Sequence, residues 1–215
     1  MSEPVRILAP DRWRRVVAAH RLNALLLSAF LTAHMINHAV AVLGPTAHGE
    51  LMSVFRLGYR NAFVEPLLLA LITGQVALGA ALLVRRFREK DKTGWSWIQL
   101  VSGGYLALFL LNHVYLGILR ARAAEGIETG FDFAAATVVV EPGAWFFRPY
   151  YALAVLALFA HLAAALHWRG AGRSVTWTLT ASGAVLGAVA VAAYAGALFP
   201  LELPGAYLAY ARNLF

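Results

Sequence analysis

The stretch WSWIQLVSGGYLALFLLNHVYLGIL, residues 95–119, decides the fold, because none of its 25 residues is Asp, Glu, Lys or Arg. A helix rises about 1.5 Å per residue, so this stretch is long enough to cross a hydrocarbon core of about 30 Å. Four more uncharged stretches of similar length occur in the chain. The sequence therefore predicts an all-α integral membrane protein, a bundle of five transmembrane helices over residues 22–43, 66–84, 95–119, 149–168 and 174–199.

The composition agrees with a chain that is solvated mainly by lipid. Hydrophobic residues make up 60% of the 215 residues and charged residues 13%, and the mean hydropathy is +0.65. A soluble domain keeps roughly a quarter of its residues charged, so a soluble enzyme and a nucleic-acid-binding protein are both disfavoured. The chain has no cysteine, which excludes disulfides, cysteine-ligated iron–sulfur clusters and haem thiolates. Any bound metal must be held by histidine or by oxygen ligands.

The distribution of positive charge predicts an orientation. Of the 18 Lys and Arg residues, 12 fall on the side that holds the N-terminus and 6 on the other side. Positive residues collect in cytoplasmic loops, which predicts a multi-pass protein of the inner membrane with its N-terminus in the cytoplasm and its C-terminus outside. We expect a cytoplasmic segment 1–21, the bundle over 22–199 and an interfacial tail 200–215 on the outer side.

The connections between the predicted spans differ in length. Those on the inner side are short, so the second and third spans, and the fourth and fifth, should be antiparallel neighbours. The outer connections, 44–65 and 120–148, are longer and carry apolar residues between their charges. We expect short amphipathic pieces there that lie on the membrane surface.

Five of the seven histidines fall inside the predicted spans. An ionisable side chain in hydrocarbon is costly and marks a functional site by default. His167 is the exception, because it lies beside Trp168 at a span end and can reach the interface. From the helical rise, His34, His38 and His113 lie about 14, 8 and 9 Å from the outer ends of their spans. His161 and Gln75 lie at about 12 and 15 Å from the inner ends, in a second layer.

Imidazoles from two facing helices at one depth suit a b-type haem with two histidine ligands. Zinc usually has three or four ligands, and the spans contain no Asp or Glu to complete such a set. His34 and His38 are one helical turn apart on one face, so a metal ion clamped by that pair is an alternative.

Several segments carry a resemblance to a known family. The segment DKTGWSWIQ, Asp91 to Gln99, is followed by Ser102, Gly103 and LNHVY around His113, and FLTAH ends at His34. The segment FAH ends at His161, and residues 59–66 look like an entry into the second helix. Together these resemble the membrane anchor of succinate dehydrogenase and fumarate reductase in its single-chain, five-helix, di-haem cytochrome b form. The resemblance covers nearly the whole chain.

The resemblance implies ligands for haem iron. It places His34, rather than its alternative His38, with His113 on an outer haem, and it places His161 on an inner haem. The fourth ligand position falls on Gln75, whose amide is a poor iron ligand. One haem b is therefore expected, and a second is left open.

The resemblance also implies a role in electron transport. The chain would be a subunit of a succinate:quinone oxidoreductase-type complex of the respiratory chain, without a catalytic site for succinate of its own. It would pass electrons between a cytoplasmic flavoprotein with its iron–sulfur subunit and membrane quinone. The cationic loops 85–92 and 169–173 are candidate docking surfaces for those subunits.

Quinone sites need a hydrogen-bond donor and a proton route beside an apolar slot. The candidates are His20, Arg21 and Asn23 at the inner interface, and Glu65, His48 and Tyr59 at the outer interface. Two other functions stay open. One is a haem-free anchor of the same complex, and the other is an unrelated proton-coupled membrane protein that uses its intramembrane histidines as a relay.

Overall fold

The computed structural model describes residues 11–214, and these form an all-α structure without strands. Five helices are long and apolar enough to cross a membrane, which confirms the predicted transmembrane bundle. The long helices are α1 (Asp11–Val40), α3 (Val64–Phe87), α4 (Gly94–Val114), α6 (Gly143–His167) and α7 (Arg173–Tyr194). The short elements are η1 (Ala41–Leu43), α2 (Pro45–Tyr59), η2 (Tyr115–Ala124), α5 (Phe131–Val139) and α8 (Gly205–Arg212).

The helices extend beyond the uncharged stretches that predict them. Helix α1 already begins at Asp11, so residues 11–21 of the expected N-terminal segment are continuous with the first span, and residues 1–10 lie outside the described part. Helix α4 begins after Thr93, whose hydroxyl accepts a hydrogen bond from the backbone N–H of Ser96. It then continues as the π-helix η2. Each long helix continues into charged residues that flank the uncharged stretch, because helix ends reach into polar surroundings.

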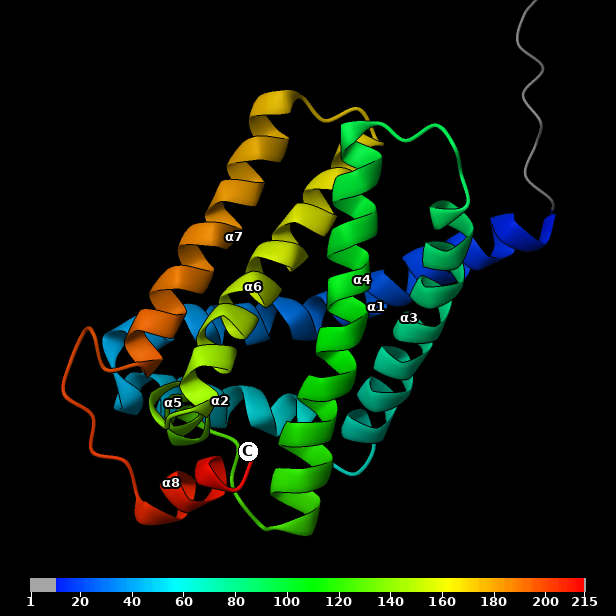
Figure 1. Cartoon of the computed structure of the whole chain (residues 1–215). Helices are drawn as coiled ribbons and strands as arrows, with labels where there is room; N and C mark the ends of the chain where they lie inside the picture. Colours follow the sequence, from blue (N-terminus) through cyan, green and yellow to red (C-terminus); the bar gives the residue numbers. More distant parts are fainter. Residues whose placement is uncertain (1–10, 215) are drawn as a thin grey trace, which may run out of the picture.

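Four long helices stand in a row, and the fifth crosses behind them (Figure 1). Helix α7 packs against α6, α6 against α4, and α4 against α3, so the predicted neighbours in each pair do pack together. Helix α1 crosses this row at a steep angle and packs against α3 and α7, the two ends of the row.

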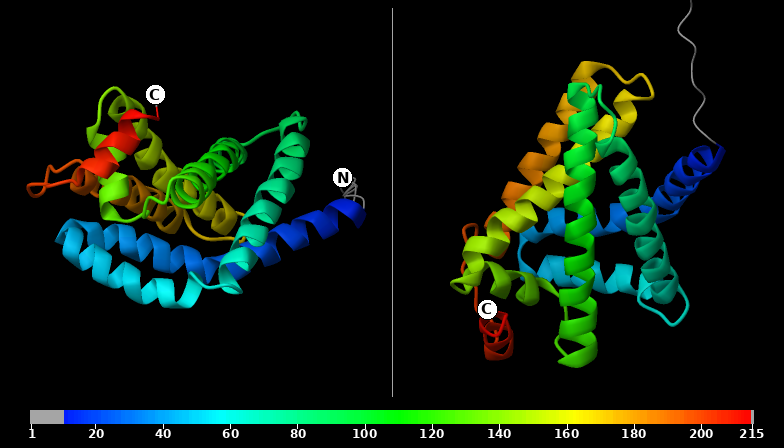
Figure 2. Two further views of the ribbon diagram at one scale, coloured as in Figure 1. Left: turned by 90° about the horizontal axis from the view of Figure 1, so that it is seen from below. Right: turned by 45° about the vertical axis from the view of Figure 1, so that its right-hand side comes forward.

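The short helices α2, α5 and α8 gather at one end of the bundle, and we call them the cap (Figure 1). After α1, Gly44 adopts a φ of 103°, which favours glycine, and the chain returns in α2 alongside α1 (Figure 2). The main cluster of buried apolar residues lies here and includes Phe131, Val138, Phe147 and Tyr194.

Helix α5 does not lie on a surface as the outer connections suggested. Five of its residues are buried, and it packs against α6, α7, α8 and α2. Its alanines Ala135 and Ala136 are at most 1% exposed, because their small side chains let α5 approach the neighbouring helices closely.

Away from the cap, the long helices expose large apolar side chains. Leu25 on α1 is 68% exposed, and Val101 and Leu108 on α4 are 64% and 71% exposed. A continuous apolar exterior on helices of this length suits lipid rather than water. The molecule has the character of a multi-pass membrane protein.

Candidate functional site

Three of the intramembrane histidines meet between α1 and α4. The ring centroids of His34 and His113 are 6.0 Å apart with planes inclined at 65°. His38 lies beside them, and its Nε2 is 3.2 Å from Nε2 of His34. The structure thus brings together the histidines that the depth estimate placed in one layer. We call His34, His38 and His113 the imidazole cluster.

Local sequence spacing orients two rings of the imidazole cluster. Phe30 precedes His34 by one helical turn and stacks on it at 5.5 Å between centroids. Phe109 precedes His113 by one turn and stacks on it at 5.1 Å. Residues four apart lie on the same helix face, so each pair is formed within its own helix. Packing of the helices then brings these two faces toward each other.

The imidazole cluster fits a haem better than a bare metal ion. Within residues 11–214, no group of three or more His, Cys, Asp or Glu is arranged to hold a metal ion. A haem iron would be held by two imidazoles, and the imidazole cluster supplies them from α1 and α4.

The imidazole cluster is connected to the cap by hydrogen bonds. The Tyr194 hydroxyl lies 2.8 Å from Nδ1 of His38 and 3.1 Å from Nε2 of His48. The side-chain amide nitrogen of Asn37 lies 2.8 Å from the same Nε2. His48 is 1% exposed, and burial, with a smaller effect of Arg56, lowers its pKa to about 4. His48 is therefore neutral at pH 7.

Sequence reasoning did not single out Asn37 or Tyr194. The only available signal was a hydrogen-bonding side chain inside an apolar helix, and many such side chains merely bond to their own helix. The sequence makes His48 a quinone-site candidate at the outer interface, whereas its side chain is buried within the cap.

A second polar group lies toward the other end of the bundle, on α1 and α3. The Asn23 amide nitrogen donates to the side-chain oxygen of Gln75 at 2.8 Å and to the carbonyl of Leu71 at 2.7 Å. The Gln75 amide nitrogen lies 3.3 Å from Nε2 of His20. Nδ1 of His20 is buried and has no hydrogen-bond partner. Both polar ends of Gln75 are thus engaged by protein groups.

His161 lies near this group but has different partners. Its Nδ1 is 3.2 Å from the Ser102 hydroxyl on α4. A Cβ atom at Gly103 would lie 3.0 Å from its Cε1, so the glycine makes room for the ring. His161 and Gln75, placed in one layer by the sequence, are not hydrogen-bonded to each other. His167 stacks on Trp95 at 4.8 Å, in agreement with a packing role at the helix end.

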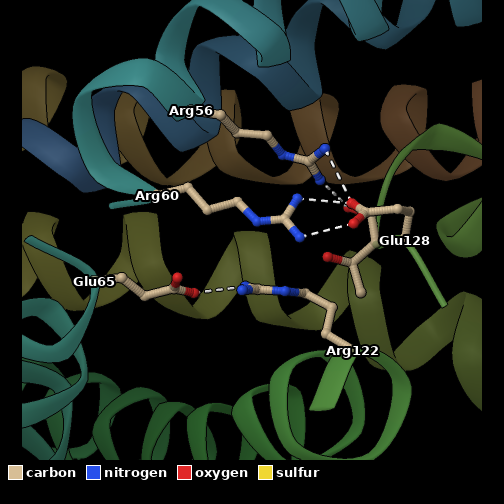
Figure 3. Close-up of polar contacts among 6 residues, drawn as sticks. Arg56, Arg60, Glu65, Arg122 and Glu128 are labelled. Carbon is tan, nitrogen blue, oxygen red and sulfur yellow. Dashed lines mark hydrogen bonds and ion pairs between the residues drawn. The ribbon is translucent and has the colours of Figure 1, made fainter. Parts of the chain in front are cut away.

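The remaining quinone candidates are dispersed. Arg21 is exposed, whereas its neighbour His20 is partly buried. Glu65 lies at the cap end and forms an ion pair with Arg122 at 2.6 Å (Figure 3). His20, Arg21 and Glu65 therefore do not form a single site.

Figure 3 also shows how the loop before α5 is attached to α2. Arg60 donates to both carboxylate oxygens of Glu128, at 2.7 and 2.8 Å, and Arg56 donates to the same carboxylate at 3.5 Å. These hydrogen bonds and charges lower the pKa of Glu128. These contacts have a structural role, because the carboxylates of Glu65 and Glu128 are each already paired with arginine.

The fold and the imidazole cluster define the class as a multi-pass helical membrane protein with clustered imidazoles between its helices. No family model, curated protein or solved structure matches the chain.

Proposed function

We propose that the chain is the membrane-anchor cytochrome b subunit of a succinate dehydrogenase or fumarate reductase type of complex. The observation that supports this most directly is the approach of His34 on α1 and His113 on α4 to 6.0 Å between ring centroids. Imidazoles from these two helices would hold a haem iron, with His38 as the alternative to His34 on α1.

When bound, the haem supplies reversible one-electron transfer. The protein's part is to hold two imidazoles, keep water away and set their orientation. His113 and either His34 or His38 hold the iron in this proposal. Phe30 and Phe109 fix the rings by stacking, and the buried side chains of the cap separate the imidazole cluster from water.

A single haem is favoured over two. In the family that the chain resembles, the fourth ligand position corresponds to Gln75. Its amide oxygen accepts a hydrogen bond from Asn23, and its nitrogen contacts His20. An amide held in this way has no free group for iron. His161 keeps one ring nitrogen on Ser102 and contributes to the polar interior of this end.

Of the quinone candidates, His20 has the most suitable chemistry. The Gln75 amide N–H donates to its Nε2, so a neutral His20 carries its proton on Nδ1. That Nδ1–H is buried and has no partner. A quinone carbonyl oxygen would accept this hydrogen bond, and Asn23 lies one turn along the same helix.

Docking of the soluble subunits would use the loop between α3 and α4. Arg86 pairs with Glu89, and Arg85 lies over the Trp13 ring, whereas Arg88 and Lys90 are exposed. Exposed cations of this kind steer an acidic protein surface toward the membrane. Charge reversal at Arg88 and Lys90 should therefore weaken capture of a flavin-containing partner, as read from the flavin content of the purified complex.

One observation favours a second function. The hydrogen bonds that join His34, His38, Tyr194 and His48 form a chain that could relay protons in a proton-coupled membrane protein. His161 is hydrogen-bonded to Ser102 instead, away from this chain. A pH-driven flux in vesicles from a porphyrin-free protein would support the relay against the cytochrome.

The test of the main proposal is the visible spectrum of the purified protein. We expect a b-type α band after dithionite reduction and one haem per chain by pyridine haemochrome. Protein expressed with ample haem supply that carries no porphyrin would contradict the cytochrome assignment and favour the haem-free anchor. Two haems per chain would contradict the role given to Gln75.

A further inference from the structure

Tyr194 stands at the junction of three structural elements. It is the last residue of α7, and its hydroxyl joins His38 on α1 to His48 on α2. Its side chain is 5% exposed, and Phe131 of α5 packs on its ring at 4.9 Å between centroids. A tyrosine hydroxyl can donate one hydrogen bond and accept others, so it can serve two imidazoles at once.

The Tyr194 hydroxyl contacts one ring nitrogen of each of two histidines. It lies 2.8 Å from Nδ1 of His38 and 3.1 Å from Nε2 of His48. A hydroxyl carries one proton, so it donates to one imidazole nitrogen while its oxygen can accept from the other. The second ring nitrogen of His38, Nε2, lies 3.2 Å from Nε2 of His34. The hydrogen bond between Nδ1 and Tyr194 therefore holds the ring of His38 with Nε2 toward His34.

We infer that Tyr194 is a positioning residue, which holds the ring of His38 through its Nδ1 and thereby sets how the ring nitrogens of the imidazole cluster face a haem iron. This inference rests on the proposed function. His48 and Asn37 support Tyr194 from α2 and α1. None of these three residues has to touch the haem.

The physical basis is the second ring nitrogen of a metal-bound histidine. A ligand whose other N–H donates to an acceptor is held in one tautomer and one orientation and is a stronger base. Hydrogen bonds to a histidine that binds haem iron change the reduction potential of the haem. Here the partner is the hydroxyl of Tyr194, whose ring belongs to the main cluster of buried apolar residues.

The experiment replaces Tyr194 by phenylalanine in the full-length, haem-loaded protein. We expect Tyr194→Phe to shift the midpoint potential of the haem, because it removes the hydrogen bond at Nδ1 of His38 and so changes the basicity of that imidazole. The ferric electron paramagnetic resonance signal should also move, because the ligand plane is no longer held. Haem affinity should fall by about 10- to 100-fold.

Tyr210→Phe is the matched control. Tyr210 is 3% exposed, and its hydroxyl donates to the carbonyl of Leu116, away from the imidazole cluster. This variant should keep the wild-type potential and resonance signal. His48→Leu offers a second route to the same question, since it removes one partner of Tyr194 and should shift the potential in the same direction by less.

Histidine tautomers provide a readout that does not need haem. In protein labelled with ¹⁵N-histidine and prepared without haem, Tyr194→Phe should change the signals of two histidines, whereas Tyr210→Phe should change none. A wild-type potential and resonance signal in both Tyr194→Phe and His48→Leu would overturn the positioning role. Absence of haem from the wild type would instead overturn the proposed function, and the ¹⁵N signals would then report on the Tyr194 contacts alone.

Discussion

The imidazole of His34 faces the imidazole of His113 with ring centroids 6.0 Å apart, although α1 and α4 each pack mainly on other helices. The two helices are not close packing partners, yet they bring these rings together. Because imidazoles are costly in an apolar interior, this relationship is the one to test first.

Removal of His113 should remove the haem. His113→Ala leaves the iron without its only candidate ligand from α4, so we expect loss of the reduced α band. If His34 is the ligand, as the family resemblance implies, His34→Ala should also lower the haem content. His38→Ala tests the alternative ligand. His167→Ala is the control, because His167 stacks on Trp95 at the other end of the bundle and should leave the spectrum intact. A normal spectrum in His113→Ala would refute the ligand assignment.

Close packing of α6 on α7 depends on glycine. A Cβ atom at Gly187 would lie 2.7 Å from the backbone oxygen of Ala152, and one at Gly183 would lie 2.4 Å from Cβ of Phe159. Gly187→Ala should therefore destabilise the protein by about 1–3 kcal/mol, because the helices must move apart. Unfolding in mixed detergent measures this loss.

Gly49→Ala provides the comparison for that measurement. Gly49 lies within α2, and a Cβ atom there would meet nothing within 4 Å. Alanine in a helix costs less conformational entropy than glycine, so this variant should be as stable as the wild type or more stable by up to about 1 kcal/mol. Equal losses in Gly187→Ala and Gly49→Ala would disprove the packing explanation.

Burial of His48 should make stability depend on pH. Its pKa is about 4 in the folded protein and 6.5 as the ordinary value, so the unfolded chain binds this proton first as the pH falls. Stability should thus be greatest above pH 6.5, decline between pH 6.5 and about 4, and show no further decline from this group below that. The measurement is the thermal unfolding temperature across this range, and His48→Gln should flatten the decline.

The two ion pairs in Figure 3 should differ in strength. Glu65 and Arg122 are 25% and 21% exposed, whereas Glu128 is 57% exposed beside Arg60. In double-mutant cycles with glutamine, the exposed pair should couple by about 1 kcal/mol or less, and the less exposed pair by more. Because the pKa of Glu128 is lowered, its contribution should be present above its ordinary pKa of 4.5 and disappear as the pH falls below it. Equal coupling of the two pairs would contradict this ranking.

Much of the fold could be predicted from local patterns. Apolar length predicts five spans, and the spacing of four residues predicts that His34 and His38 share a face. The stacking of Phe30 and Phe109 on histidines was not predicted, although it follows the same spacing. The helix ends were less predictable, because α1 and α6 extend through charged or proline-containing residues. Helix α5 was expected at a surface, but its alanines allow it to pack inside the cap.

The sequence by itself determined the helices, their number and the presence of imidazoles in hydrocarbon, because the length of an apolar stretch and the rise of a helix are local properties. Only the tertiary structure decided that α1 crosses the row, that His34 meets His113 and that Tyr194 joins His38 to His48. Such contacts depend on how helices far apart in the chain pack, and depth along a helix does not specify the direction in which a side chain points.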